Sequence, residues 1–141
     1  MIGMLLAFAT GCGSPEPMTF VVPTDYEGWV VVEFAVSGLD PAPLEAGVRV
    51  LRIDASGRAK TGSPLRAGKL GYADAGGRSL SVLEDDGVGY DAAHAVTRDA
   101  PFACCRTNGT AQAGDAPERT FEWFYVGRGP AGEPPALLGT L

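Results

Sequence analysis

Histidine is almost absent from this chain, which has one such residue, His94, among its 141 positions. Any Ser-His-Asp or Cys-His catalytic arrangement would therefore have to use His94. The sequence also lacks a Gly-x-Ser-x-Gly elbow, a His-Glu-x-x-His zinc motif and a phosphate-cradling Gly-x-x-x-x-Gly-Lys loop. We therefore expect a protein that is not an enzyme and that requires no cofactor.

Positive charge is scarce as well. Eleven Lys and Arg residues stand against 17 Asp and Glu residues, which gives a formal net charge of -6 at pH 7. The arginines are scattered along the chain, so no basic surface is expected that could hold a phosphate backbone. This composition argues against a nucleic-acid partner.

The sequence has no apolar run of the roughly 20 residues that a membrane-spanning helix needs. Its first apolar run, residues 1–9, ends instead at Thr10-Gly11-Cys12 and is followed by polar residues and prolines. An apolar stretch closed by small residues directly before a cysteine is typical of a bacterial lipoprotein signal, in which the cysteine is lipidated. We predict acylation of Cys12, and a plain secreted or an intracellular protein are the alternatives.

These features predict the organisation of the chain. Residues 1–11 are a signal peptide, residues 12–18 a flexible tether, and residues 19–129 a single folded domain. Residues 130–141 form a C-terminal extension that either lies against the fold or is disordered. The protein is expected in the cell envelope, held to a membrane by the acyl chain on Cys12, on the periplasmic face or at the cell surface.

The folded region is predicted to be mainly β, because 20 glycines and 11 prolines in a chain that is 45% hydrophobic indicate short elements and frequent turns. We expect a single antiparallel β-sandwich of the transthyretin (prealbumin)-like or immunoglobulin-like type, with little helix apart from the signal segment. The predicted strands are Thr19–Val22, Trp29–Val36, Val48–Asp54, Leu70–Ala73, Ser79–Leu83 and Thr120–Val126.

Alternation within these segments predicts which side chains face the core. Val30, Val32 and Phe34 share one face of their strand. Leu80 and Val82 are expected to point inward. The apolar Val48 and Val50 fall on the parity opposite to Leu51 and Ile53, which are expected to face the core, so this strand could contain a bulge or an early register change. Asp54-Ala55-Ser56-Gly57 is expected to be a turn, and Asp74-Ala75-Gly76-Gly77 a hairpin turn.

Several segments resemble, in order, a family of small bacterial lipoproteins and envelope proteins known only as a domain of unknown function. They are Phe20-Val21-Val22-Pro23, residues 26–34, residues 52–57, Thr61-Gly62-Ser63-Pro64 and Phe124-Tyr125-Val126-Gly127. The resemblance spans residues 19–129 and implies no catalytic residues. The opening strand is also similar to transthyretin-like and carboxypeptidase-regulatory-type β-sandwiches, a likeness of fold that implies no activity.

The adjacent residues Cys104 and Cys105 allow three interpretations. The simplest is two free thiols that point to opposite faces of a strand. A disulfide between neighbours is the second, although adjacent Cα atoms lie about 3.8 Å apart and a disulfide usually spans about 4.4–6.8 Å. The third is metal ligation together with His94. The last two interpretations would make the chain a thiol-redox or metal-binding envelope protein.

Two further groups could bind ligands. The acidic residues Glu84, Asp85, Asp86 and Asp91 suggest a calcium site, but their spacing departs from an EF-hand loop and a solvated turn explains them better. The aromatic residues Tyr26, Trp29, Trp123 and Tyr125 could form a surface for a protein or glycan partner, or could instead fill the core. We therefore expect a non-catalytic binding or structural role.

Overall fold

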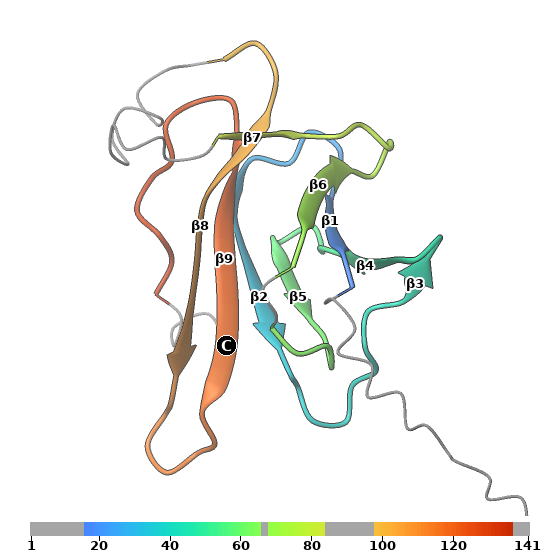
Figure 1. The fold of residues 1–141 in the computed structure, drawn as a ribbon. Helices are drawn as coiled ribbons and strands as arrows, with labels where there is room; N and C mark the ends of the chain where they lie inside the picture. The colour runs from blue at the N-terminus through green and yellow to red at the C-terminus, as the bar shows by residue number, and fades with distance from the viewer. Residues whose placement is uncertain (1–15, 66–67, 84–97, 137–141) are drawn as a thin grey trace, which may run out of the picture.

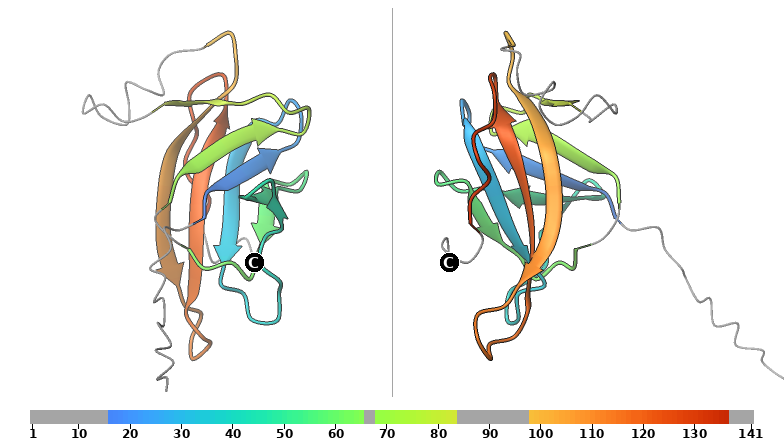
Figure 2. Two further views of the ribbon diagram at one scale, coloured as in Figure 1. Left: turned by 45° about the vertical axis from the view of Figure 1, so that its right-hand side comes forward. Right: turned by 90° about the vertical axis from the view of Figure 1, so that its left-hand side faces the viewer.

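The computed structural model describes residues 16–65, 68–83 and 98–136, and all regular secondary structure in these ranges is β-strand, as predicted (Figure 1). Two sheets face each other and enclose the core between them (Figure 2). The strands are β1 (Met18–Val22), β2 (Gly28–Phe34), β3 (Leu44–Glu45), β4 (Val48–Arg52), β5 (Arg58–Lys60), β6 (Leu70–Asp74), β7 (Ser81–Leu83), β8 (Phe102–Ala111) and β9 (Arg119–Gly127).

Both sheets contain parallel as well as antiparallel pairs, so the prediction of a single antiparallel sandwich is wrong. The four-stranded sheet has the order β3-β4-β1-β6, and the five-stranded sheet has the order β5-β2-β9-β8-β7. Strand β1 runs parallel to both β4 and β6, β2 runs parallel to β5, and β7 runs parallel to β8. Among the strands that the structure describes, only β3–β4, β2–β9 and β8–β9 are antiparallel pairs.

The parallel pairing of β1, β4 and β6 arises because the chain crosses from the four-stranded to the five-stranded sheet three times, directly after each of these strands. Strands β1, β4 and β6 lie in the four-stranded sheet, and each is followed by a strand of the five-stranded sheet. The three connecting turns, residues 23–27, 54–58 and 74–78, therefore lie at one edge of the four-stranded sheet, which we term the turn edge. Because each of these turns carries the chain to the other sheet, the strands before and after the turn cannot pair with each other as the two strands of a hairpin do.

Two of these turns share the sequence Asp-Ala-x-Gly-Arg and the same hydrogen bonds. In residues 54–58, the Asp54 carboxylate accepts hydrogen bonds from the backbone N–H groups of Ser56 and Arg58, at 2.8 and 2.9 Å. In residues 74–78, the carboxylate of Asp74 accepts the equivalent two bonds, both at 2.9 Å. Both segments are turns, as predicted, but the second makes only a single antiparallel bridge, Ala73 to Ser79, before the chain changes sheet.

The predicted alternation of the central strand is confirmed. Val30, Val32 and Phe34 are buried and face the four-stranded sheet, where Phe20 occupies the middle of the opposing layer. The ring of Phe124 packs against those of Phe20 and Tyr72, at centroid distances of 5.2 and 4.9 Å. Offset and edge-on arrangements at these distances stabilise an aromatic core.

Several predicted details differ from the structure. Strand β2 ends at Phe34, because Ala35 has a positive φ of 54° and the chain turns away before Val36. Strand β4 has no bulge, since it pairs with β1 in uninterrupted register. Leu80 is buried as predicted, but Val82 is 49% exposed, because β7 lies at the edge of its sheet.

Candidate functional site

Strand β8, which the sequence pattern did not predict, pairs irregularly with β9 near its start. Cys104 pairs with Tyr125 of β9, but the next regular pair joins Thr107 to Trp123. Cys105 and Arg106 therefore oppose the single residue Phe124, and Cys105 has a positive φ of 68°. A β-bulge of this kind re-aims the side chains that it carries.

Cys105, at the first position of the bulge, forms a disulfide with its neighbour Cys104. Their Cα atoms lie 3.7 Å apart, and the Cys104 side chain is buried whereas that of Cys105 is half-buried. Of the three interpretations of this pair, the structure has the vicinal disulfide in place of the expected free thiols. Opposite-facing thiols require a regular strand, and the bulge removes that regularity at Cys105.

The disulfide lies in the wall of a pocket of about 420 Å³. One side of the pocket is formed by β6 of the four-stranded sheet, and the other by β7 and β8 of the five-stranded sheet. We term it the disulfide pocket. Its lining residues are Gly68, Leu70, Tyr72, Val82, Leu83, Ala103, Cys104, Cys105 and Arg106.

Arg106, at the second position of the bulge, is held by a buried carboxylate on the neighbouring strand. Its Nε and one terminal nitrogen donate to the two carboxylate oxygens of Glu122, at 2.8 and 3.1 Å. The Glu122 side chain is 1% exposed and that of Arg106 is 37% exposed. These bonds raise the pKa of Arg106 above its usual value. The bidentate pair compensates a charge that would be costly to bury alone.

Tyr72 provides a second polar group in the pocket. Its side chain is buried, and burial together with the charge of Glu122 raises the pKa of Tyr72 to about 12. The phenol is therefore neutral near pH 7. Its hydroxyl has no hydrogen-bond partner among residues 16–65, 68–83 and 98–136. Buried polar atoms without a partner are rare in proteins and mark positions where a further group could bind.

The structure brings three of the four predicted aromatic residues together. Trp29 and Tyr125 are paired across β2 and β9, with ring centroids 5.6 Å apart, and Trp123 occupies the next position on the same face. This face of the five-stranded sheet points away from the core, and all three rings are half-buried. Tyr26 does not belong to it, because its ring packs against the core and its hydroxyl donates to the Trp29 carbonyl oxygen at 2.6 Å.

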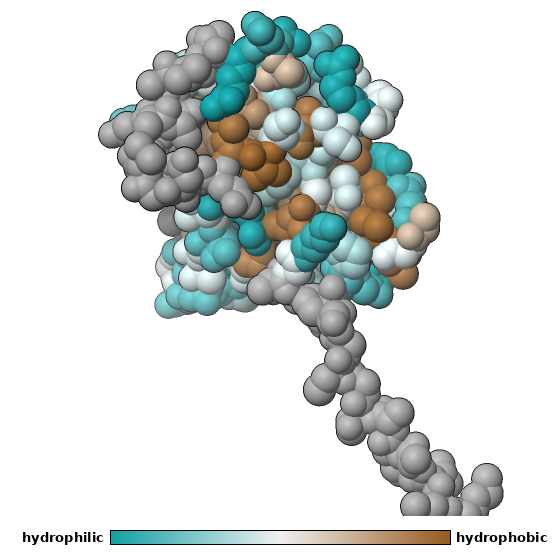
Figure 3. Space-filling model, turned by 45° about the horizontal axis from the view of Figure 1, so that its top comes forward, coloured by the Kyte–Doolittle hydropathy of each residue, from teal (hydrophilic) through white to brown (hydrophobic). Residues whose placement is uncertain are grey.

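The C-terminal extension covers part of this aromatic face. The indole N–H of Trp29 donates to the carbonyl oxygen of Gly132 at 3.2 Å, so the described part of the extension lies against the sheet. On the face of the molecule that Figure 3 shows, the described residues present several separate hydrophobic patches with polar groups between them.

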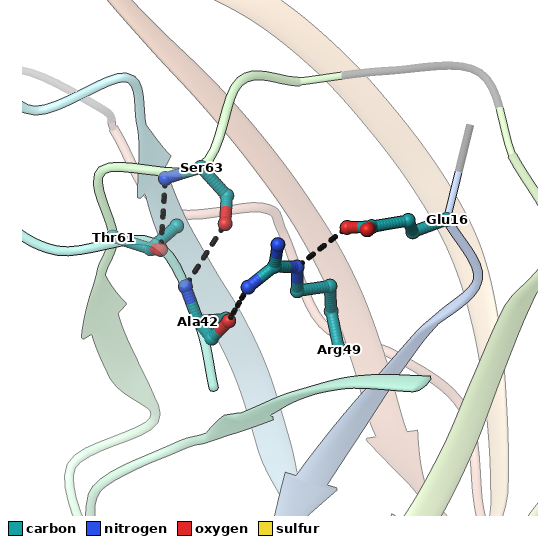
Figure 4. Close-up of polar contacts among 5 residues, drawn as sticks. All are labelled: Glu16, Ala42, Arg49, Thr61 and Ser63. Atoms are coloured by element: carbon teal, nitrogen blue, oxygen red, sulfur yellow. Dashed lines mark hydrogen bonds and ion pairs between the residues drawn. The ribbon is translucent and has the colours of Figure 1, made fainter. Parts of the chain in front are cut away.

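A chain of polar contacts ties the start of β1 to the body of the fold (Figure 4). Arg49 of β4 donates to the Glu16 carboxylate at 2.6 Å and to the Ala42 carbonyl oxygen at 2.8 Å. The Ala42 backbone N–H in turn donates to the hydroxyl of Ser63 at 2.9 Å, and the Ser63 N–H donates to the hydroxyl of Thr61 at 3.1 Å. This chain of contacts fixes Glu16, which lies inside the predicted tether of residues 12–18, just before β1 begins at Met18.

The remaining predicted site residues lie outside the described part of the chain. They are the lipidation site Cys12, the single histidine His94, and the acidic residues Glu84, Asp85, Asp86 and Asp91. Within the described part, no three His, Cys, Asp or Glu residues are arranged to hold a metal ion. The same residues include no helix with the length and apolar character needed to span a membrane.

The prediction from sequence missed Tyr72, Arg106 and Glu122 as site residues. The sequence pattern did indicate that Glu122 is buried, because its side chain falls on the same face of the strand as those of the inward-facing Phe124 and Val126. A charged residue in an inward-facing row requires a buried partner. Its partner Arg106 lies 16 residues earlier, on the strand that was not predicted.

Comparison with known proteins confirms the predicted resemblance over part of the chain. Residues 14–72 match a family of unknown function (DUF6843). The crystal structure of a candidate lipoprotein from Bacillus anthracis has the same fold, with a TM-score of 0.50 and 18% sequence identity. The similarity covers 86% of this chain and 84% of that one. No curated protein matches the sequence.

Proposed function

We propose that this chain is a lipid-anchored protein of the bacterial cell envelope that has a non-catalytic binding role. The observation that carries the anchor is the position of Cys12 at the end of an apolar run, six residues before β1 begins at Met18. The family match starts just after this cysteine, at residue 14. The similar structure from Bacillus anthracis, itself described as a candidate lipoprotein, also supports the proposal.

The polar groups of the disulfide pocket support binding rather than catalysis. The Arg106 guanidinium is held by Glu122, and the Tyr72 hydroxyl is neutral near pH 7. Both groups can donate hydrogen bonds, but neither is poised to take a proton from a substrate, as a general base must. The aromatic face of Trp29, Trp123 and Tyr125 offers a second surface, which suits a protein or glycan partner.

Metabolic labelling tests the anchor. The full chain, expressed in a bacterium with labelled palmitate, should incorporate label and partition into detergent, and Cys12→Ser should abolish both. Globomycin should make the unprocessed form accumulate. The Cys104→Ser/Cys105→Ser variant is the matched control, and it should be labelled like the wild type. Labelling that persists in Cys12→Ser, or its absence from the wild type, would refute the anchor.

Thiol–disulfide exchange is a second candidate function, favoured by the presence of the Cys104–Cys105 disulfide in a pocket wall. An external thiolate would attack one sulfur, form a mixed disulfide and release the other as a thiolate, and a second external thiolate would complete the two-electron reduction. Thiol titration in a glutathione buffer tests this function. If two free thiols appear when the buffer is set to the redox potential of the compartment, exchange is favoured. If the disulfide persists at that potential, the binding role is favoured.

A further inference from the structure

The disulfide pocket has room for a small molecule. Its volume of about 420 Å³ falls within the range of roughly 300–1,000 Å³ that is usual for small-molecule sites. Space remains because two of the lining positions, Gly68 and Ala103, carry no side chain or only a methyl group. Tyr72 and Ala103, which belong to the buried core cluster, form part of the pocket wall.

About half of the pocket wall is apolar. Leu70, Leu83 and Ala103 contribute aliphatic groups from three strands, and the disulfide adds polarizable sulfur. Val82, at 49% exposed, forms part of the lining where the pocket meets solvent. Such a wall favours a ligand whose body is apolar, because burial removes that surface from water.

Two of the residues that line the pocket carry hydrogen-bond donors that are not fully used. The buried Tyr72 hydroxyl has no partner among the described residues. Arg106 uses two of its three nitrogens on Glu122, and the third, Nη1, has no hydrogen bond to any described residue. Both groups can donate to one oxygen atom of a bound molecule.

The charge balance of the pocket argues against an ionised ligand. The carboxylate of Glu122 already neutralises Arg106, and both of its oxygens accept from that guanidinium. A ligand carboxylate would have to be desolvated close to this buried negative charge without a free cation to compensate it. An uncharged carbonyl or hydroxyl oxygen meets no such penalty.

From these observations, and resting on the binding role proposed above, we propose that the disulfide pocket binds a small uncharged molecule with an apolar body and one oxygen acceptor, which accepts hydrogen bonds from Tyr72 and Arg106. The apolar residues of β6, β7 and β8 enclose the body of the ligand. The hydroxyl of Tyr72 selects the oxygen, since it is buried and has no other partner within the described part of the chain.

Fluorescence titration with Prodan, a neutral naphthyl ketone, tests this inference on the full chain carrying Cys12→Ser, which has no acyl anchor. We expect saturable binding with a blue-shifted emission. Tyr72→Phe should weaken binding about three- to tenfold, the loss of one hydrogen bond. Tyr26→Phe, which removes a tyrosine hydroxyl that lies outside the pocket and donates to the Trp29 carbonyl oxygen, is the matched control and should bind like the parent. Ala103→Leu should fill the pocket and prevent binding.

Competition then defines the ligand class. Neutral acetylnaphthalene should displace Prodan, whereas naphthoate, a carboxylate of similar shape, should displace it poorly. No saturable binding, equal affinity in Tyr72→Phe, or stronger competition by naphthoate would each overturn the inference. If Ala103→Leu fails to fold, Tyr72→Phe decides the outcome. Palmitate labelling does not depend on the pocket, so the inference and the proposed anchor can fail separately.

Discussion

At the scale of single residues, two buried glutamates on opposite faces of the five-stranded sheet show how this fold accommodates charge. Glu122 faces the core and is paired with Arg106, whereas Glu33 faces outward and is paired with Arg119. Each arginine binds its carboxylate through two nitrogens and comes from a different strand than the glutamate. Bidentate geometry of this kind is what makes an ion pair tolerable where water is excluded.

The Arg106–Glu122 pair leads to a prediction about stability. Arg106→Met should lower the free energy of unfolding by about 3 kcal/mol, because it leaves a buried carboxylate without its cation. Adding Glu122→Met should restore much of the loss, since the second change removes that charge. Urea unfolding monitored by circular dichroism measures both effects. Arg52→Met, which breaks the exposed pair with Glu45, is the control and should change stability by less than about 1 kcal/mol. A double variant no more stable than Arg106→Met would contradict this account.

Glu33 predicts a dependence of stability on pH. Hydrogen bonds from Arg119, with further attraction from Arg119 and Lys60, lower the pKa of Glu33 below its ordinary value of 4.5. The unfolded chain therefore binds a proton at Glu33 at a higher pH than the folded chain does. The stability that Glu33 contributes is full above pH 4.5 and is lost as the pH falls through the lowered pKa.

Urea unfolding between pH 6 and pH 3 tests this dependence. Glu33→Gln should be less stable than the wild type at pH 6, and the difference should shrink as the pH falls. Glu133→Gln, at an exposed position that has no ion pair in the described chain, is the matched control. A Glu33→Gln deficit that stays constant across this range would show that the ion pair is not its source.

At the scale of the elements, local pattern predicted most strands but not how they pair. The alternation of Val30, Val32 and Phe34 identified the central strand, and the Asp-Ala-x-Gly sequences identified two turns. Parallel pairing was missed because the turns that end β1, β4 and β6 carry the chain to the other sheet. Residue alternation records which face is buried, and it holds no information on which sheet a strand joins.

The candidate site was only partly predictable for a related reason. Cys104 and Cys105 were identified from their adjacency, but whether they pair depends on a bulge set by the register between β8 and β9. Strand β8 itself was missed because its second half is polar and exposed. The pocket combines β6 and β7 with β8, which lies well after them in the sequence, so Tyr72 and Arg106 become neighbours only in the folded chain.

The loop after β5 makes a close backbone contact that predicts a strict requirement for glycine. Gly62 donates its N–H to the carbonyl oxygen of Asp40 at 2.9 Å, and a Cβ at this position would overlap the carbonyl oxygen of Leu39. Gly62→Ala should therefore lower the free energy of unfolding by about 1–3 kcal/mol. Gly132→Ala, where a Cβ would meet open space, should change it by less than about 0.5 kcal/mol. Equal stability of the two variants in urea would contradict the contact.

At the scale of the whole molecule, the direction of β1 relates the fold to the proposed anchor. Met18 starts this strand six residues after Cys12, so even a fully extended tether spans only about 20 Å. The contacts of Arg49 with Glu16 and Ala42 fix the chain at that point (Figure 4). Strands β4 and β6 run in the same direction as β1, so the turn edge lies at the end of the four-stranded sheet that is remote from the tether.

This geometry predicts which end of an acylated chain lies nearer to a membrane. Ala46, before β4, lies at the tethered end, and Ser56, in the turn that follows this strand, lies at the turn edge, roughly 20 Å farther along. With a dye on Ala46→Cys or Ser56→Cys and acceptor lipids in the vesicle, energy transfer should be stronger from position 46. Cys12→Ser forms of both variants are the controls and should show little transfer. Equal transfer from the two acylated proteins would mean that the tether leaves the domain free to lie in any orientation, and that the turn edge is not preferentially exposed to partners.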